Sequence, residues 1–332
     1  MIHSPFKIIC LTAALSGLLI GCDGPSDRPT DKGQLPVVAG VPPLAFLIEQ
    51  IGGQHVRVET LVQSNQDPHT FEPTPQQVLA LSRSAVFFKI GMPFENRVVE
   101  RVRQANPKLK VVDIGEGVKK LSDCCAAHDE KHQGEHSHET APHHADHDHH
   151  AAPHDHHRSE SDTEFDPHIW LSPPLLKIQA TNIARALAEV DVAHAADYRN
   201  NLEQFLRRLD QLHERLAKVF APYRGRSFVV FHPGFAYFAD SYGLKEEAVE
   251  AGGRQPTPNQ LRALIEKAKA EGIKTIFVQP QYDPHSVDVL AEAIGAKVVP
   301  MNGLARDVMN DIEDIANKVE AALGESKPAP QR

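Results

Sequence analysis

Hydrophobic and polar positions alternate along this chain in a way that predicts β-strands separated by α-helices. Short runs rich in β-branched and aromatic residues recur in two groups, with helical stretches between them. The runs lie at 36–40, 56–62, 85–90 and 110–114 in the first group and at 227–231, 275–279 and 297–300 in the second. Alternation of this kind is typical of βα units, so we expect an α/β fold.

One long helix is predicted between the two groups of strands. Apolar residues recur there at steps of four and three and form a single stripe; they are Tyr198, Leu202, Phe205, Leu209, Leu212, Leu216 and Val219. A helix from about 193 to 220 is roughly 40 Å long at ~1.5 Å per residue, which is enough to brace two lobes. We therefore expect two Rossmann-like βα lobes joined by one long α-helix.

A repeated sequence supports two similar halves. "PTPQQVLAL" at 73–81 resembles "PTPNQLRAL" at 256–264, and in each copy the threonine can N-cap a helix whose first turn holds the next proline. Capping alone would also explain the likeness. The expected divisions are a signal peptide at 1–22, a flexible tether at 23–34, an N-terminal lobe at 35–190, a linking helix at 191–222, a C-terminal lobe at 223–324 and a tail at 325–332.

The first residues are typical of a lipoprotein leader. Lys7 precedes the apolar run "IICLTAALSGLLI", which is too short to remain as a transmembrane helix. The run ends in "LIGC", which resembles the lipobox of bacterial lipoproteins, where cleavage leaves a lipidated cysteine at the mature N-terminus. Cys22 is therefore the expected lipid anchor, with an ordinary signal peptide as the alternative. Anchoring in the inner or the outer membrane stays open.

A histidine-rich segment interrupts the first lobe. From 122 to 164 the chain has no Val, Ile, Leu, Met or aromatic residue, so we expect a disordered insertion. It holds 12 of the chain's 20 histidines, which predicts weak auxiliary metal sites, with a solvated spacer as the alternative. For Cys124 and Cys125, a vicinal disulfide, free thiols and metal capture are all open. The histidines are His128, His132, His136, His138, His143, His144, His147, His149, His150, His154, His156 and His157.

The motif Asp-Pro-His-x-aromatic occurs twice in the expected N-terminal lobe. "DPHTFEPTP" at 67–75 and "DPHIWLSPP" at 166–174 each fix the backbone before a histidine and end in prolines that can launch a helix. The imidazole then lies on a constrained loop, where binding residues concentrate. Because a tight metal site needs convergent imidazoles or carboxylates on rigid backbone, we expect His69 and His168 to bind one shared ion. The aspartate of each motif would cap a turn or hold an imidazole.

The C-terminal half adds two candidates where predicted strands end. "SFVVFHPGFAYFADSYGL" runs from a strand into His232, and "TIFVQPQYDPHSV" runs from a strand into Asp283. Ligands bind at the carboxyl ends of strands in open α/β sheets. His232 could instead be a satisfied polar residue, and Asp283 could cap the next helix because Pro284 follows it. His285, in a third Asp-Pro-His, is the alternative to Asp283.

Taken together, these four motifs resemble those of the metal-binding proteins of bacterial zinc and manganese ABC importers. This is the ZnuA/TroA-like group, or cluster A-I, of solute-binding proteins, and the resemblance covers nearly the whole mature chain. It implies a metal site in the cleft between the lobes with the ligands His69, His168, His232 and Asp283. In this group zinc binders carry histidine at the position of His232 and manganese binders carry glutamate. Three imidazoles and one carboxylate also suit Zn²⁺ better than Mn²⁺.

The function that the resemblance implies is zinc capture outside the cytoplasmic membrane. The protein would deliver Zn²⁺ to the membrane subunit and ATPase of an ABC importer, as a monomer in the periplasm or cell envelope held by a lipid on Cys22. A net charge of −9 without a basic patch argues against nucleic acid as a partner. The alternatives are a manganese receptor of the same class, a metal-buffering or adhesin lipoprotein, and a hydrolase. An enzyme is disfavoured because the chain has neither "HExxH" nor G-x-S-x-G.

Overall fold

The computed structural model of the chain describes residues 33–121, 165–250 and 256–326. The expected lipidation site Cys22 and the segment 122–164, with its twelve histidines and its cysteine pair, lie outside these ranges. Within the described ranges, no helix has both the length and the apolar character that crossing a bilayer requires.

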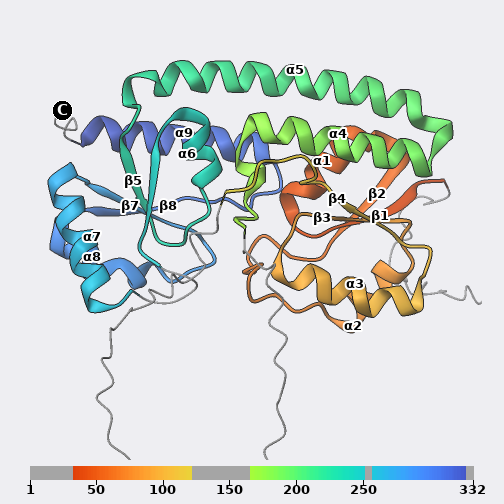
Figure 1. Cartoon of the computed structure of the whole chain (residues 1–332), viewed down its shortest axis with the longest axis horizontal. Helices are drawn as coiled ribbons and strands as arrows, with labels where there is room; N and C mark the ends of the chain where they lie inside the picture. The colour runs from red at the N-terminus through yellow and green to blue at the C-terminus, as the bar shows by residue number, and fades with distance from the viewer. Residues whose placement is uncertain (1–32, 122–164, 251–255, 327–332) are drawn as a thin grey trace, which may run out of the picture. The chain divides into compact units, whose positions relative to one another are not determined.

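The first lobe is built on four parallel strands in the order β2-β1-β3-β4. Figure 1 shows helices on both sides of this sheet. Strands covered on both faces are expected to be apolar, and each of the two central strands β1 and β3 has three buried residues while the rest are half-buried. The elements are β1 (Leu35–Ala39), α1 (Pro42–Gly52), β2 (Val56–Thr60), α2 (Pro75–Ser82), β3 (Val86–Lys89), α3 (Pro93–Ala105) and β4 (Lys110–Asp113).

The second lobe repeats this plan with four parallel strands in the order β6-β5-β7-β8. One of them, β6, is absent from the strands that the sequence predicts, because its "KEEA" is charged and lies at the edge of the sheet. The elements are β5 (Ser227–Val230), α6 (Ala236–Tyr242), β6 (Lys245–Ala248), α7 (Pro258–Glu271), β7 (Thr275–Val278), the short helix η5 (Pro284–Val287), α8 (Asp288–Ile294), β8 (Lys297–Pro300) and α9 (Val308–Glu325).

A long helix joins the lobes, as the apolar stripe predicts. α5 (Ala195–Phe220) follows α4 (Pro173–Val190) and packs against α1 and α4 of the first lobe and against α6 and α9 of the second (Figure 1). Its buried side chains are Tyr198, Phe205, Leu209, Leu212, Leu216 and Phe220. Two parallel-sheet lobes with one connecting helix confirm the predicted fold.

The two threonine caps occupy equivalent places in the two lobes. Thr74 caps α2 and Thr257 caps α7, and each forms a capping box with a glutamine three residues later. Since α2 follows β2 and α7 follows β6, the repeated sequence marks the same step of each lobe. The loops that leave the carboxyl ends of these strands and of their neighbours carry the candidate ligands.

Candidate metal centre

His69 lies on the loop between β2 and α2. The carboxylate of Asp67 accepts hydrogen bonds from the backbone N–H of His69 at 2.9 Å and from the hydroxyl of Thr70 at 3.2 Å. An aspartate that binds the backbone two residues on forms an Asx-turn, which holds this loop without help from the imidazole. The half-buried ring of His69 is therefore presented by the backbone of a rigid turn.

His168 lies on the second copy of the motif, where it begins the short helix η2 (Ile169–Leu171) ahead of α4, and its backbone makes the same turn. Oδ1 of Asp166 accepts from the backbone N–H of His168 at 2.8 Å, as Asp67 does in the first copy. It also lies 2.7 Å from Nδ1 of the imidazole. Because an ionised carboxylate only accepts, Nδ1 carries the proton and Nε2 keeps a lone pair. Both residues are buried, with Asp166 only 2% exposed.

His232 follows the carboxyl end of β5 and is held at two places. The side-chain amide of Gln279 bonds the backbone of His232 twice, accepting from its N–H at 3.3 Å and donating to its carbonyl at 2.5 Å. On the ring, Nδ1 lies 2.7 Å from the carboxylate of Glu250. By the same reasoning as for His168, the proton is on Nδ1 and Nε2 presents a lone pair.

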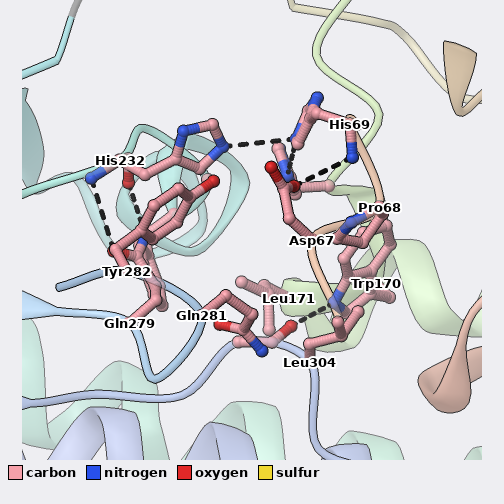
Figure 2. Close-up of a pocket in the computed structure, with 14 residues that line it drawn as sticks. Asp67, Pro68, His69, Trp170, Leu171, His232, Gln279, Gln281, Tyr282 and Leu304 are labelled. Atoms are coloured by element: carbon pink, nitrogen blue, oxygen red, sulfur yellow. Dashed lines mark hydrogen bonds between the residues drawn. The ribbon is translucent and has the colours of Figure 1, made fainter. Parts of the chain in front are cut away.

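The ring nitrogens of His69, His168 and His232 form one cluster, with their ligand atoms within 4.8 Å of one another. Figure 2 shows the contact between His69 and His232 in this cluster. Nε2 of His69 lies 3.3 Å from Nε2 of His168 and 3.2 Å from Nε2 of His232. Zinc–nitrogen bonds of about 2.0–2.1 Å in a tetrahedral site place two ligand nitrogens about 3.3–3.4 Å apart. The observed separations are those of two edges of such a tetrahedron.

Hydrogen bonding alone does not account for this cluster. Burial, reinforced by the neighbouring imidazoles of His168 and His232, lowers the pKa of His69 to about 2, so its ring is neutral and has a single N–H. That N–H can satisfy at most one of the two short contacts of Nε2. At least one of the two contacts is therefore not a hydrogen bond, and a cation placed between the nitrogens would stabilise the arrangement.

The cavity at this point suits an ion in size and lining. Its volume is about 40 Å³, which exceeds the ~10–15 Å³ that one water requires and is far below the ~300 Å³ of a small organic ligand site. Much of its wall is apolar and includes Trp170, Leu171, Phe235 and Leu304. Oδ2 of Asp166 is buried and has no hydrogen-bond partner among the described residues. This uncompensated negative charge behind one imidazole favours a cation in the cavity.

A half-buried glutamate supports the loop that follows His232. The side chain of Glu246 accepts from the backbone N–H groups of Gly234 and Phe235 at 2.9 and 2.8 Å. Burial raises the pKa of Glu246 to about 7. Gly234 in turn lies against the ring of His168, and a Cβ at this position would lie 3.5 Å from the imidazole. That is an ordinary van der Waals distance, so the loops of His168 and His232 pack in direct contact here and a small side chain would also fit.

Asp283 is not brought together with the three imidazoles. Among the described residues the group of convergent ligand atoms consists of His69, His168 and His232. The exposed carboxylate of Asp283 instead caps η5 by accepting from the backbone N–H of His285 at 3.0 Å. The ring of His285 is also exposed and bonds Asp288. As ligands, both residues stay predictions that this geometry does not support.

Glu250 and Gln279 contact His232, but no sequence motif identifies them. Both reach it from neighbouring strands of the sheet, so their places depend on strand register, and Glu250 follows a strand that the sequence does not predict. In "FVQPQ", Gln279 stands at the end of a predicted strand. This position is the only feature of the sequence that indicates a role for Gln279 at the site.

Comparison with known proteins decides the family. The family described as ZnuA, zinc-uptake complex component A periplasmic, matches residues 37–322. The chain belongs to the ZnuA family. Its members are periplasmic metal-binding components of uptake systems, and the resemblance in the sequence motifs is confirmed.

Individual proteins of this kind are similar to the chain at moderate sequence identity. A Chlamydia muridarum protein named for metal binding is 26% identical over 291 residues, which cover 87% of this chain and 90% of that one. The high-affinity zinc uptake protein ZnuA of Brucella abortus is 28% identical over 169 residues, or 48% of this chain and 51% of its own. The crystal structure of a ZnuA deletion mutant with zinc bound is 33% identical with a TM-score of 0.73, covering 89% of this chain and 100% of that one.

Proposed function

We propose that this ZnuA-family protein is a high-affinity zinc receptor that delivers Zn²⁺ to an ABC importer, with His69, His168 and His232 as its ligands. The observation that carries the proposal is the convergence of three Nε2 atoms at separations of 3.2 and 3.3 Å. Three neutral nitrogen donors match Zn²⁺, whereas Mn²⁺ favours carboxylate and water oxygens. The zinc-binding names of the Brucella protein and of the similar crystal structure point the same way.

The small cavity favours a receptor over an enzyme. A hydrolytic zinc site uses three protein ligands and keeps a fourth position open for water and substrate. Here about 40 Å³ is available, which leaves room for an ion and water but not for an organic substrate. The fourth position is then filled by water, or by Asp283 after a movement of its loop.

The proposed setting is the periplasm, close to the membrane. Cys22 would carry the lipid and residues 23–34 would tether the lobes, with 35–190, 191–222 and 223–324 as N-terminal lobe, linking helix and C-terminal lobe. The receptor would work as a monomer and hand its ion to the permease and ATPase of the importer. The histidines of 122–164 would add weak metal sites without being needed for the tight one.

The test is a competitive zinc titration of metal-free protein, with variants matched in their local chemistry. We expect one tight zinc site, weaker Mn²⁺ binding, and loss of the tight site in His168→Ala. His194→Ala is the matched control, because Nδ1 of His194 also lies 2.7 Å from an aspartate, Asp191, but the ring is outside the cluster. Tight binding that survives His168→Ala, stronger binding of Mn²⁺, or several equal weak sites would each overturn the proposal.

A further inference from the structure

The three imidazoles are not held in the same way. Nδ1 of His168 faces Asp166 and Nδ1 of His232 faces Glu250, each at 2.7 Å. Both carboxylates are shielded from water, with side-chain exposures of 2% and 11%. Nδ1 of His69 has no such partner within the described part of the chain. Two imidazoles of the cluster are therefore fixed by a carboxylate behind them, and the third is fixed through its backbone turn.

We propose that Glu250 is a positioning residue that fixes the tautomer and orientation of His232 for metal binding, an inference that rests on the proposed function of the site. A neutral imidazole has one N–H, and the carboxylate of Glu250 requires it on Nδ1. Nε2 is then left as a lone pair that points into the cavity before any ion arrives. Without Glu250 either tautomer is open to His232, and the form with a proton on Nε2 presents no lone pair to the cavity.

The strand register explains why this glutamate reaches His232. β6 pairs with β5 so that Ala248 lies opposite Val230. The pairing continues beyond both strands, because the backbone N–H of Glu250 donates to the carbonyl of Phe231 at 2.9 Å. Two residues past Ala248 and Val230, this register sets Glu250 opposite His232. Side chains opposite each other on adjacent strands lie on the same face of the sheet, which brings the carboxylate to the ring.

Charge gives Glu250 a second effect on the same site. Three neutral imidazoles contribute no charge of their own to balance a divalent cation. Asp166 and Glu250 place two negative charges directly behind two of them, and in a buried site such charges interact strongly with an ion. The carboxylates therefore supply the compensation that the exposed Asp283 does not provide in this geometry.

The experiment compares Glu250→Ala and Glu250→Gln with a control on the same strand. Glu247 is the control, since its carboxylate pairs with Lys267 and does not contact His232. Zinc affinity is measured by competition with a chelator. The tautomer of His232 is read in metal-free protein labelled with ¹⁵N-histidine, from the ring nitrogen shifts, and the resonance is assigned by its loss in His232→Gln.

The expected result is a zinc affinity about 10- to 100-fold weaker in Glu250→Ala, with a smaller loss in Glu250→Gln, whose amide oxygen still accepts from Nδ1. The zinc affinity of the control variant Glu247→Gln should stay within about threefold of the wild-type affinity. Metal-free Glu250→Ala should show protonation of Nε2 in His232, which a merely structural role would not produce.

An unchanged tautomer of His232 overturns the inference, as does wild-type zinc affinity in Glu250→Ala. If wild-type protein fails to bind zinc, the proposed function fails, and the tautomer measurement still decides the role of Glu250. If Glu250→Ala does not fold, Glu250→Gln must show the weaker affinity for the inference to stand.

Discussion

Replacing His69 by alanine tests the cluster most directly, because His69 is the imidazole that contacts both of the others. Structural zinc sites release about 10–16 kcal/mol on binding, or roughly 3 kcal/mol for each of four ligands. Loss of one ligand should therefore raise the Kd for zinc about 100-fold, since about 1.4 kcal/mol is a factor of ten. The fold should persist, because the turn at Asp67 is made by the backbone of His69 and not by its ring.

Thermal unfolding at a fixed free zinc concentration measures this change. At a concentration about 1,000 times the wild-type Kd, zinc stabilises the folded protein by about 4 kcal/mol, and a 100-fold weaker variant gains only about 1.4 kcal/mol. For a domain of this size each kcal/mol raises Tm by about 2–4 °C. The zinc-induced rise in Tm should thus fall from about 8–16 °C to about 3–6 °C.

His285→Ala is the matched control, because His285 also follows an Asp-Pro pair and its backbone N–H also bonds the aspartate two residues before it. Its ring is exposed and bonds Asp288, outside the cluster. The control should show the full wild-type rise in Tm. Equal losses in both variants, or a wild-type response of His69→Ala, would refute the assignment of the site.

Further predictions concern other parts of the chain. Asp283→Asn should weaken zinc binding less than tenfold in a chelator competition, because asparagine also caps η5. Deleting 126–162 should lower the number of zinc ions bound in a titration and keep one tight site. Cys22→Ala should abolish labelling by a fatty-acid probe, which persistent labelling would contradict. Burial raises the pKa of Glu95 from 4.5 to about 7, so the folded state keeps a proton that the unfolded state loses. Through Glu95 alone the free energy of unfolding should therefore fall by about 3 kcal/mol between pH 4.5 and pH 7. Urea denaturation of Glu95→Gln should show a fall smaller by this amount, with the contribution of Glu246 retained.

The sequence predicts those features of the fold that depend on local patterns. Alternating apolar runs identify seven of the eight strands in the described ranges, and a stripe with helical spacing identifies α5. Both threonine caps follow from a proline and a glutamine at fixed offsets. These signals are readable because each one lies within a few residues of the chain.

Features that depend on tertiary register were not predictable in this way. β6 is an edge strand whose "KEEA" is mostly charged, so its composition does not mark it as a strand. Glu250 is 18 residues from His232 and reaches it only through the pairing of β5 with β6. For Asp283 the sequence allows two roles, since an aspartate before proline can cap the adjacent helix or bind a metal together with distant residues. In this structure the local hydrogen bond to the backbone of His285 decides its place.

Division of the cluster between the lobes bears on how an ion could leave it. His69 and His168 come from the first lobe and His232 from the second, and the 3.2 Å separation of Nε2 atoms crosses from one to the other. Near this crossing the side chain of Gln281 donates to the carbonyl of Ser64 at 2.7 Å, which ties the loop after β7 to the loop after β2. A zinc–nitrogen bond of about 2.1 Å is lost once the ligand retreats by about 1 Å. A shift of that size would release the ion. Other hydrogen bonds also join the lobes, such as that from Nε1 of Trp170 to the carbonyl of Gly303 at 2.6 Å, but so small a movement does not require them or the bracing helix α5 to give way.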